Sequence, residues 1–389
     1  MIDTIVLTVK SGMFTILDHN KFSPSTIGFY DSSSYYNLGS RGNFKCVQNP
    51  TKTELKLGIY KPRLTVYKRI NQKRKFEIVL KIEFSVPKLV FGNNFNEVCE
   101  KDFSNIINKL KNILKNMGVF IFEESLIEAS VSAVHFSKNI VLTDYSIPYT
   151  YISQLKKLDI NKRLDVNQTD FRNAGSIFKF RTNSFEIVFY DKMRELEQGI
   201  KSEKRSEEKD NILQLNLFDY LKQKKPFEVL RYEIRLNKRQ KIISILNKIK
   251  YNAQPIFKNI FNENLARDIL LYYINEMENM SPKLPDFESM NYKDFFESIL
   301  LANQNLRLSQ ALEITGFKAL ICEVGVREFR QLISRFGNYQ WYKLNSKFKK
   351  LKYKNKLDIF SFLRKEISEF KLLRSFDNDK KMLNNVNYN

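Results

Sequence analysis

A tyrosine at the end of a strand-like run is the first candidate for chemistry in this sequence. Apolar and polar residues alternate from Phe185 to Tyr190, and this period of two predicts a β-strand with one buried face. The alternation places Tyr190 on the face opposite the phenylalanines, and Lys192 follows two residues later. A phenol can attack a phosphodiester when a nearby cation holds the phosphate and the cost of ionising the hydroxyl is lowered. Tyr190 and Lys192 are therefore a candidate nucleophile and its cationic partner.

The same residues also have a purely structural interpretation. The chain has 19 tyrosines, and a tyrosine at a strand end commonly packs its ring while its hydroxyl stays in water. The Tyr-x-Lys pattern occurs again at Tyr220 and Lys222, inside a charged stretch that we expect to be less ordered. Spacing alone leaves both interpretations of Tyr190 open.

A second strand-like run, from Ala129 to Ile140, carries one of only two histidines in the chain. His135 is followed by Lys138 and Asn139, so it is either a metal ligand beside a phosphate site or an ordinary half-buried histidine. A third run, from Phe227 to Leu236, places Glu233 on one face between Arg231 and Arg235. Glu233 is either a structural acid held by two ion pairs or a metal ligand among phosphate-binding cations.

Composition limits the classes of partner. Lysine and arginine number 65 against 43 acidic residues, which gives a net charge of +22 and favours polyanions, with nucleic acid first and an anionic membrane surface second. The three scattered cysteines indicate neither disulfides nor a zinc site. No signal peptide or membrane-spanning run is predicted, so we expect a soluble cytoplasmic protein with no membrane partner.

The order of the predicted elements indicates an α+β fold with a central, mainly antiparallel sheet. We expect a catalytic domain over residues 1–240, with a charged insertion at about 193–226, then a helical DNA-binding domain over 241–376 and a disordered tail over 377–389. Within the first domain, strands are predicted over 2–10, 54–60, 63–69 and 76–84, and a helix over 96–117.

Two helical segments around a break at Gly337 are compatible with a helix-turn-helix. The second segment carries polar side chains suited to DNA contact, which are Gln340, Lys343, Lys347 and Lys350. An ordinary helical hairpin with a solvated lysine face is the alternative.

Several blocks together resemble one family in their order along the chain. They are Glu83–Lys88 running on through Phe91–Phe95 to Asp102-Phe103, Val131–Asn139, Tyr190-Asp191-Lys192, Arg231–Arg235, and Gly325-x-Arg327-x-x-Arg330-Gln331-Leu332, with the Met1-Ile2-Asp3 start in addition. The chain resembles the replication initiators of filamentous phages and related plasmids, the gene II/X replication proteins. The resemblance covers most of residues 1–240 and, more loosely, the helical part.

The resemblance implies a site-specific DNA nickase that starts rolling-circle replication through a 5′-phosphotyrosine and a free 3′-hydroxyl. It implies Tyr190 as nucleophile, Lys192 as a stabiliser of phosphate or phenolate, and Mg²⁺ or Mn²⁺ held by His135 and Glu233. Related initiators often have a His-hydrophobe-His pair; this chain has only His135 there, so Asp191 is the expected additional ligand.

The implied partners are double-stranded origin DNA, single-stranded DNA, a host helicase and a DNA polymerase. No Walker-type glycine-rich loop occurs in the sequence, so unwinding is expected to come from a partner. The residues expected to contact DNA are Lys138, Asn139, Arg231, Arg235, Arg327, Arg330, Gln340, Lys343 and Lys347.

Two alternatives stay open. One is an origin-binding replication protein that recruits host factors without cutting DNA. The other is a relaxase or transposase that uses the same tyrosine chemistry and differs only in the steps after cleavage.

Overall fold

The computed structural model describes most of the chain. The described residues are 1–29, 45–51, 53–54, 57–70, 76–142, 146–157, 165–166, 176–200, 228–280, 291–303, 305–337, 339–349 and 359–374. Tyr220, Lys222, Lys350, the tail from 377 and most of the expected insertion lie outside them.

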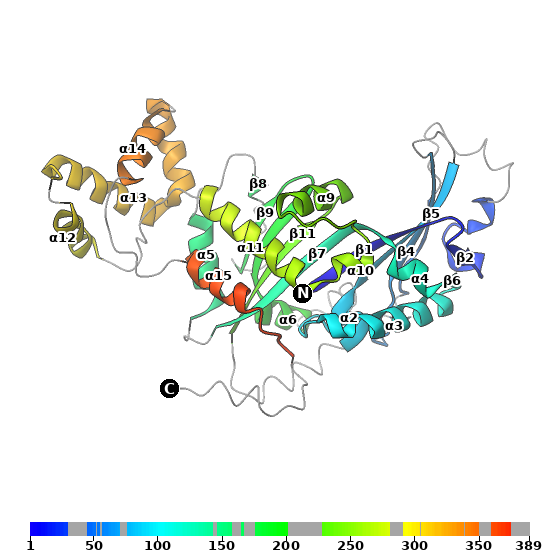
Figure 1. Ribbon diagram of the computed structural model, residues 1–389. Helices are drawn as coiled ribbons and strands as arrows, with labels where there is room; N and C mark the ends of the chain where they lie inside the picture. Colours follow the sequence, from blue (N-terminus) through cyan, green and yellow to red (C-terminus); the bar gives the residue numbers. More distant parts are fainter. Residues whose placement is uncertain are drawn as a thin grey trace.

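A nine-stranded antiparallel sheet forms the centre of the molecule (Figure 1), in the order β3-β4-β5-β1-β7-β11-β10-β9-β8. Its strands are β1 (Ile2–Lys10), β3 (Lys45–Gln48), β4 (Arg63–Ile70), β5 (Phe76–Ser85), β7 (Ser130–Leu142), β8 (Asp165–Val166), β9 (Ile177–Arg181), β10 (Phe185–Asp191) and β11 (Glu228–Leu236). A separate pair joins β2 (Phe14–Ile16) to β6 (Val119–Ile121). The expected α+β fold with an antiparallel sheet is confirmed.

Helices follow and interrupt the strands. They are α2 (Val86–Phe91), α3 (Phe103–Asn116), α4 (Glu123–Ile127), α5 (Pro148–Lys157), α6 (Lys192–Ile200), α9 (Arg239–Lys248), α10 (Phe257–Ile260), α11 (Glu263–Met280), α12 (Tyr292–Ala302), α13 (Leu308–Ile333), α14 (Tyr339–Lys349) and α15 (Ile359–Glu369). Short 3-10 turns are η1 (His19–Lys21), η2 (Thr26–Phe29), η4 (Glu100–Asp102) and η6 (Ser334–Phe336).

The two faces of the sheet differ in chemistry. Alternate residues of each strand point to opposite faces, and one face is apolar and covered by helices, with α11 and α15 side by side across it (Figure 1). On that face the Tyr232 hydroxyl donates to the carbonyl of Leu270 in α11, and Phe185 contacts Tyr273 of the same helix. The opposite face of β7, β11 and β10 carries Tyr190, Arg231, Glu233, Arg235 and His135.

A second hydrophobic core lies in the helical unit formed by α12, α13 and α14, at the left of Figure 1. It is centred on Phe317, Phe329 and Trp341. The helices on either side, α9 to α11 and α15, instead contribute to the core of the sheet. The hydrophobic cores therefore do not divide at residue 240, because the chain returns to the sheet after the helical unit.

Two local expectations need correction. The described part of residues 54–60 contains no strand, because Gly58 has a positive φ of 70° and the amide of Ile59 donates to the carbonyl of Glu54 in a turn. The helix expected from 96 begins at Phe103, because the segment before it is held against β7. Among the described residues, no helix is long and apolar enough to cross a bilayer.

Candidate active site

The register of three neighbouring strands gathers the polar candidates in rows, because directly opposed residues in an antiparallel sheet share a face. The rows, taken from β10 through β11 to β7, are Tyr190, Arg231 and Asn139; Val188, Glu233 and Ser137; and Glu186, Arg235 and His135. Chemistry-bearing residues from three distant parts of the sequence therefore meet on one surface of the sheet.

The Tyr190 side chain is directed at Glu233. Its hydroxyl donates to Glu233 Oε1 at 2.8 Å, and only 7% of the residue is exposed. Burial raises the pKa of Tyr190 well above its usual value, and the Arg231 guanidinium only partly opposes this effect. The phenol is therefore held neutral, with its proton aimed at a carboxylate.

Glu233 is surrounded by guanidinium groups. Arg231 Nε donates to Oε1 at 2.7 Å, and Arg235 donates to Oε2 from Nε at 2.9 Å and from Nη2 at 2.7 Å. Burial alone would raise the pKa of Glu233, but Arg235 and Arg231 outweigh it and hold that pKa far below the usual value of a glutamate. Glu233 is thus a buried anion whose two oxygens are both occupied.

Arg231 is the centre of this network. Besides Glu233, its guanidinium donates to Asp3 Oδ1 at 2.6 Å, to Ser137 Oγ, to Asn139 Oδ1 and to the Asn94 carbonyl. The side chain is almost fully buried. Fully buried arginines are rare unless every donor is matched, and this one joins β1, β7 and β11 to the loop after α2.

Lys192 begins helix α6 directly after Tyr190 and Asp191. Its ammonium donates to Asn94 Oδ1 at 2.8 Å and to Glu195 Oε2 at 2.6 Å, and it lies 5.8 Å from the centroid of the Tyr190 ring. Burial lowers the pKa of Lys192, although Glu195 opposes this shift. Lys192 is thus a buried cation next to the Tyr190 ring.

His135 lies at the edge of the cluster, in the row of Arg235. Burial and the Arg235 charge lower its pKa, against the opposing effects of Glu233 and Asp3. A neutral imidazole is thus favoured, and its side chain is hydrogen-bonded to Asn237. The structure therefore brings His135 to the same face as Glu233.

Asp191 does not join them. It follows Tyr190 by one residue, so it lies on the opposite face of the sheet. Its Oδ1 accepts the amide of Arg194 at 3.0 Å, which is the bond of a helix cap at the start of α6. Asp191 therefore has a structural contact and is not placed with His135 and Glu233.

The donor set does not fit a divalent cation in this arrangement. Among the described residues, no group of three or more His, Cys, Asp or Glu side chains is arranged to hold a metal. The carboxylate expected as a ligand gives both oxygens to arginines, which also repel a cation. We therefore assign Mg²⁺ and Mn²⁺ no step in the chemistry of this cluster.

Lys138 and Asn139, expected to contact DNA, are buried. Lys138 lies on the helix-covered face, where its ammonium pairs with Glu97 and donates to the Lys371 carbonyl. Asn139 Nδ2 donates to the Phe95 carbonyl at 2.7 Å while its oxygen accepts from Arg231. Both residues hold the end of β7 in place. Arg235, with 29% of its side chain exposed, is more accessible to a phosphate than either of them.

The remaining candidates lie in the helical unit. Gln340 and Lys343 are exposed on α14, Lys347 donates to both oxygens of Glu313, and the Arg330 guanidinium lies 5.9 Å from the Trp341 ring. Arg327 belongs to α13, but its side chain is outside the described part of the structure. The described candidates among them lie on the helical unit and not in the strands that carry Tyr190.

Sequence reasoning missed several members of the cluster. They are Asp3, Asn94, Ser137, Glu186 and Glu195. The contact between Lys192 and Glu195 could have been predicted, because the two residues are three apart and such residues are neighbours on a helix. The pairing of Asp3 with Arg231 had no such signal, because 228 positions separate the two residues.

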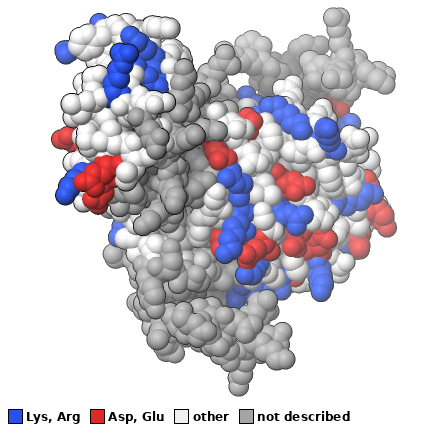
Figure 2. Space-filling view, turned by 60° about the vertical axis from the view of Figure 1, so that its left-hand side comes forward, with Lys and Arg blue, Asp and Glu red and all other residues white. Residues whose placement is uncertain are grey.

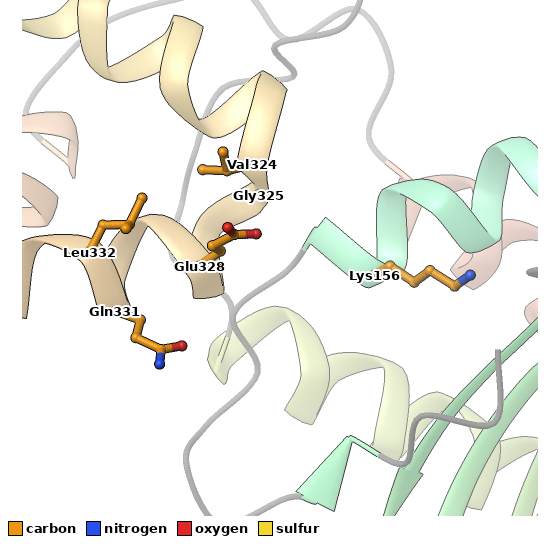
Figure 3. Close-up of a pocket in the computed structure, with 6 residues that line it drawn as sticks. All are labelled: Lys156, Val324, Gly325, Glu328, Gln331 and Leu332. Carbon is orange, nitrogen blue, oxygen red and sulfur yellow. The ribbon is translucent and has the colours of Figure 1, made fainter. Parts of the chain in front are cut away.

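A pocket of about 470 Å³ lies away from this cluster, between α5 and α13 (Figure 3). It is lined by Lys156, Val324, Gly325, Glu328, Gln331 and Leu332. The wall is interrupted at Gly325, whose φ of 81° breaks α13 into two helices. In Figure 3 the Lys156 side chain points away from the α13 residues, so we assign the pocket no role in the chemistry.

Comparison with models of protein families, with curated proteins and with solved structures gives no match for this chain.

Proposed function

We propose that the protein is a DNA nicking-closing enzyme that cuts one strand by tyrosine transesterification to initiate rolling-circle replication of a phage or plasmid. The observation that carries the proposal is the Tyr190 hydroxyl, which donates to Glu233 within a cluster of buried cations. The net charge of +22 and the resemblance to gene II/X replication initiators support DNA as the substrate.

In the proposed reaction the Tyr190 oxygen attacks phosphorus, and the bond from phosphorus to the 3′-oxygen breaks. Tyr190 passes its proton to Glu233, and the leaving 3′-oxygen takes a proton from Lys192, a cation of lowered pKa whose ammonium lies 5.8 Å from the Tyr190 ring centroid. The phosphotyrosine keeps the bond energy, so attack by a 3′-hydroxyl reverses the step and rejoins the strand.

Substrate binding supplies the change that activates Tyr190. A carboxylate with so low a pKa is a weak base while its arginines are fully engaged. A DNA phosphate that reaches the partly exposed Arg235 competes with Glu233 for the guanidinium. The pKa of Glu233 then rises while the phosphate is bound, so that Glu233 can accept the proton of Tyr190.

The proposal is tested with a supercoiled plasmid that carries the DNA around the protein's own gene. The wild-type protein should convert it to an open circle, and Tyr190→Phe should bind the DNA without nicking it. Tyr232→Phe is the matched control, because that buried hydroxyl lies in the neighbouring strand on the other face, bonded to Leu270. Tyr190→Phe that nicks at the wild-type rate would refute the proposal.

The same assay is run with Mg²⁺, with Mn²⁺ and with EDTA, because a metal is the part of the expectation that the described residues do not support.

A non-catalytic origin-binding protein is the second candidate, and the burial of Tyr190 favours it. In that case the buried cluster serves only to join the strands. Wild-type protein that shifts its own origin DNA but never nicks it would favour this second function.

A further inference from the structure

The outer side of α14 and the turn before it carry a group of exposed aromatic side chains. Phe336, Tyr339 and Tyr342 are 63%, 75% and 64% exposed, at a spacing of three residues. The burial of an aromatic ring is favourable, so three exposed rings leave a large unused contribution to the free energy of binding or folding. Such an exposed group is a common mark of a binding surface.

Among the described side chains of α14, Trp341 is the aromatic residue that faces inward, and it sets the orientation of the helix. Trp341 is buried in the core of the helical unit, where its ring contacts Phe317 with centroids 6.2 Å apart. With 3.6 residues per turn, Tyr339 and Tyr342 then fall on the outward side of the same helix, as does Lys343. Gly337, with a φ of 105°, makes the turn that places Phe336 before this helix.

Cations are interleaved with these rings. The Arg335 guanidinium lies 4.6 Å from the centroid of the Phe336 ring, and Lys343 is exposed one turn after Tyr339. From residue 329 to residue 357 the sequence has nine lysines and arginines and no acidic residue. Figure 2 shows Lys and Arg side chains gathered at the upper end of the helical unit, at the height where Figure 1 places α14.

We propose that this aromatic and basic surface binds single-stranded DNA, with unpaired bases stacked on Phe336, Tyr339 and Tyr342. Rings present π-faces to unpaired bases, and neighbouring cations bind the phosphates between those bases. Paired bases in a duplex are already stacked and offer no such face, so the surface favours the single strand over the double helix. The inference rests on the proposed function only for the identity of the polyanion as DNA.

The test measures the affinity of the full-length protein for a fluorescent oligothymidine of about 20 nucleotides, which has no secondary structure. The double variant Tyr339→Ala with Tyr342→Ala should weaken binding by about tenfold or more, because each stacked base contributes substantially. Tyr339→Phe with Tyr342→Phe keeps the rings and should bind like the wild type.

Tyr292→Ala is the matched control, since Tyr292 is another half-exposed tyrosine of the same helical unit, on α12. Trp341 is the only tryptophan in the chain and lies in the core of the unit, so its fluorescence shows that each variant stays folded.

Wild-type affinity in the double alanine variant overturns the proposal. A loss that is the same for a duplex of equal length overturns the preference for single strands. Sedimentation that shows the variant losing only self-association would assign the surface to a second copy of the chain and would also overturn it. Nicking is measured separately: if the wild type does not nick but the aromatic variant loses oligothymidine binding, this inference stands and the proposed function fails.

Discussion

At the scale of single residues, the polar cluster depends on how its charges compensate one another. Arg231 and Arg235 balance Glu233, Asp3 and Glu186, and most of these groups are shielded from water. A buried ion pair gives little net stability in itself, but the loss of one partner leaves an uncompensated charge. The cluster is therefore sensitive to any single substitution.

Arg231→Met tests that sensitivity. The variant leaves Asp3 without the guanidinium 2.6 Å away and leaves Glu233 with one arginine instead of two. We expect the free energy of unfolding to fall by about 3–5 kcal/mol, measured by urea denaturation. Arg181→Met is the control, because Arg181 is largely exposed and pairs with Glu186 only at 3.5 Å. Equal stability of the two variants would contradict this account of the cluster.

The contacts of Glu233 with Arg231 and Arg235 follow from spacing, since residues two apart on a strand share a face. The sequence therefore indicated this part of the site. It did not indicate that both carboxylate oxygens are occupied, because that depends on side-chain geometry. Asp191 was expected as a metal ligand, but it follows Tyr190 directly, and neighbouring residues of a strand point to opposite faces. Its capping contact with Arg194 also depends on where α6 begins, which the spacing of residues does not show.

At the scale of elements, the end of β7 is held by the loop after α2 and by the segment after α15. Glu97 joins all three, since its carboxylate accepts the Lys138 ammonium, the Asn139 amide and the Leu373 amide. The periodicity of the sequence predicted that the helix begins at residue 96, within this loop, whereas α3 begins at Phe103. Periodicity cannot show that a buried carboxylate in the loop binds two distant segments.

Glu97→Gln gives a prediction on pH. Burial opposes ionisation, but Lys138, the N-terminal ammonium and the Asn139 amide outweigh it, so the pKa of Glu97 is lower in the folded state than its usual 4.5. Its contribution to stability is therefore present above about pH 4.5 and is lost as the pH falls below that value. Glu97→Gln should be less stable than the wild type at neutral pH and should show a weaker acid dependence, in urea titrations over a range of pH.

Glu123→Gln is the control for that titration, because Glu123 is 44% exposed and lies 3.5 Å from Lys111 at the surface. Its free energy of unfolding at neutral pH should be close to that of the wild type, because an exposed ion pair contributes little. An unchanged acid dependence in Glu97→Gln would show that other carboxylates control acid unfolding.

At the scale of the whole molecule, the described residues form a large core around the sheet and a separate core in the helical unit. The sequence predicted the change from strands to helices near residue 240 because periodicity changes there. It did not show that α9, α10, α11 and α15 pack against the sheet. The helices of both cores have the same helical spacing of apolar residues, so this spacing does not show which core a helix joins.

Two deletions distinguish these cores. Replacement of residues 281–358 by a flexible linker should leave a cooperative thermal transition in circular dichroism, since α11 and α15 remain to cover the sheet. Truncation after residue 240 should abolish that transition, because it exposes the apolar face. The internal deletion should also weaken DNA binding and reduce its salt dependence. A stable 1–240 fragment would contradict this division.

If Tyr190 forms the bond to DNA, it must be the modified tyrosine in the covalent product, and that residue can be identified by mass spectrometry. The protein is incubated with single-stranded oligonucleotides from the region around its gene, the DNA is digested, and the modified peptide is sequenced by mass spectrometry. We expect a nucleotide attached through its 5′-phosphate to Tyr190, and no such peptide from Tyr190→Phe. A nucleotide on Tyr220 or any other tyrosine, or nicking that leaves no covalent product, would contradict this expectation.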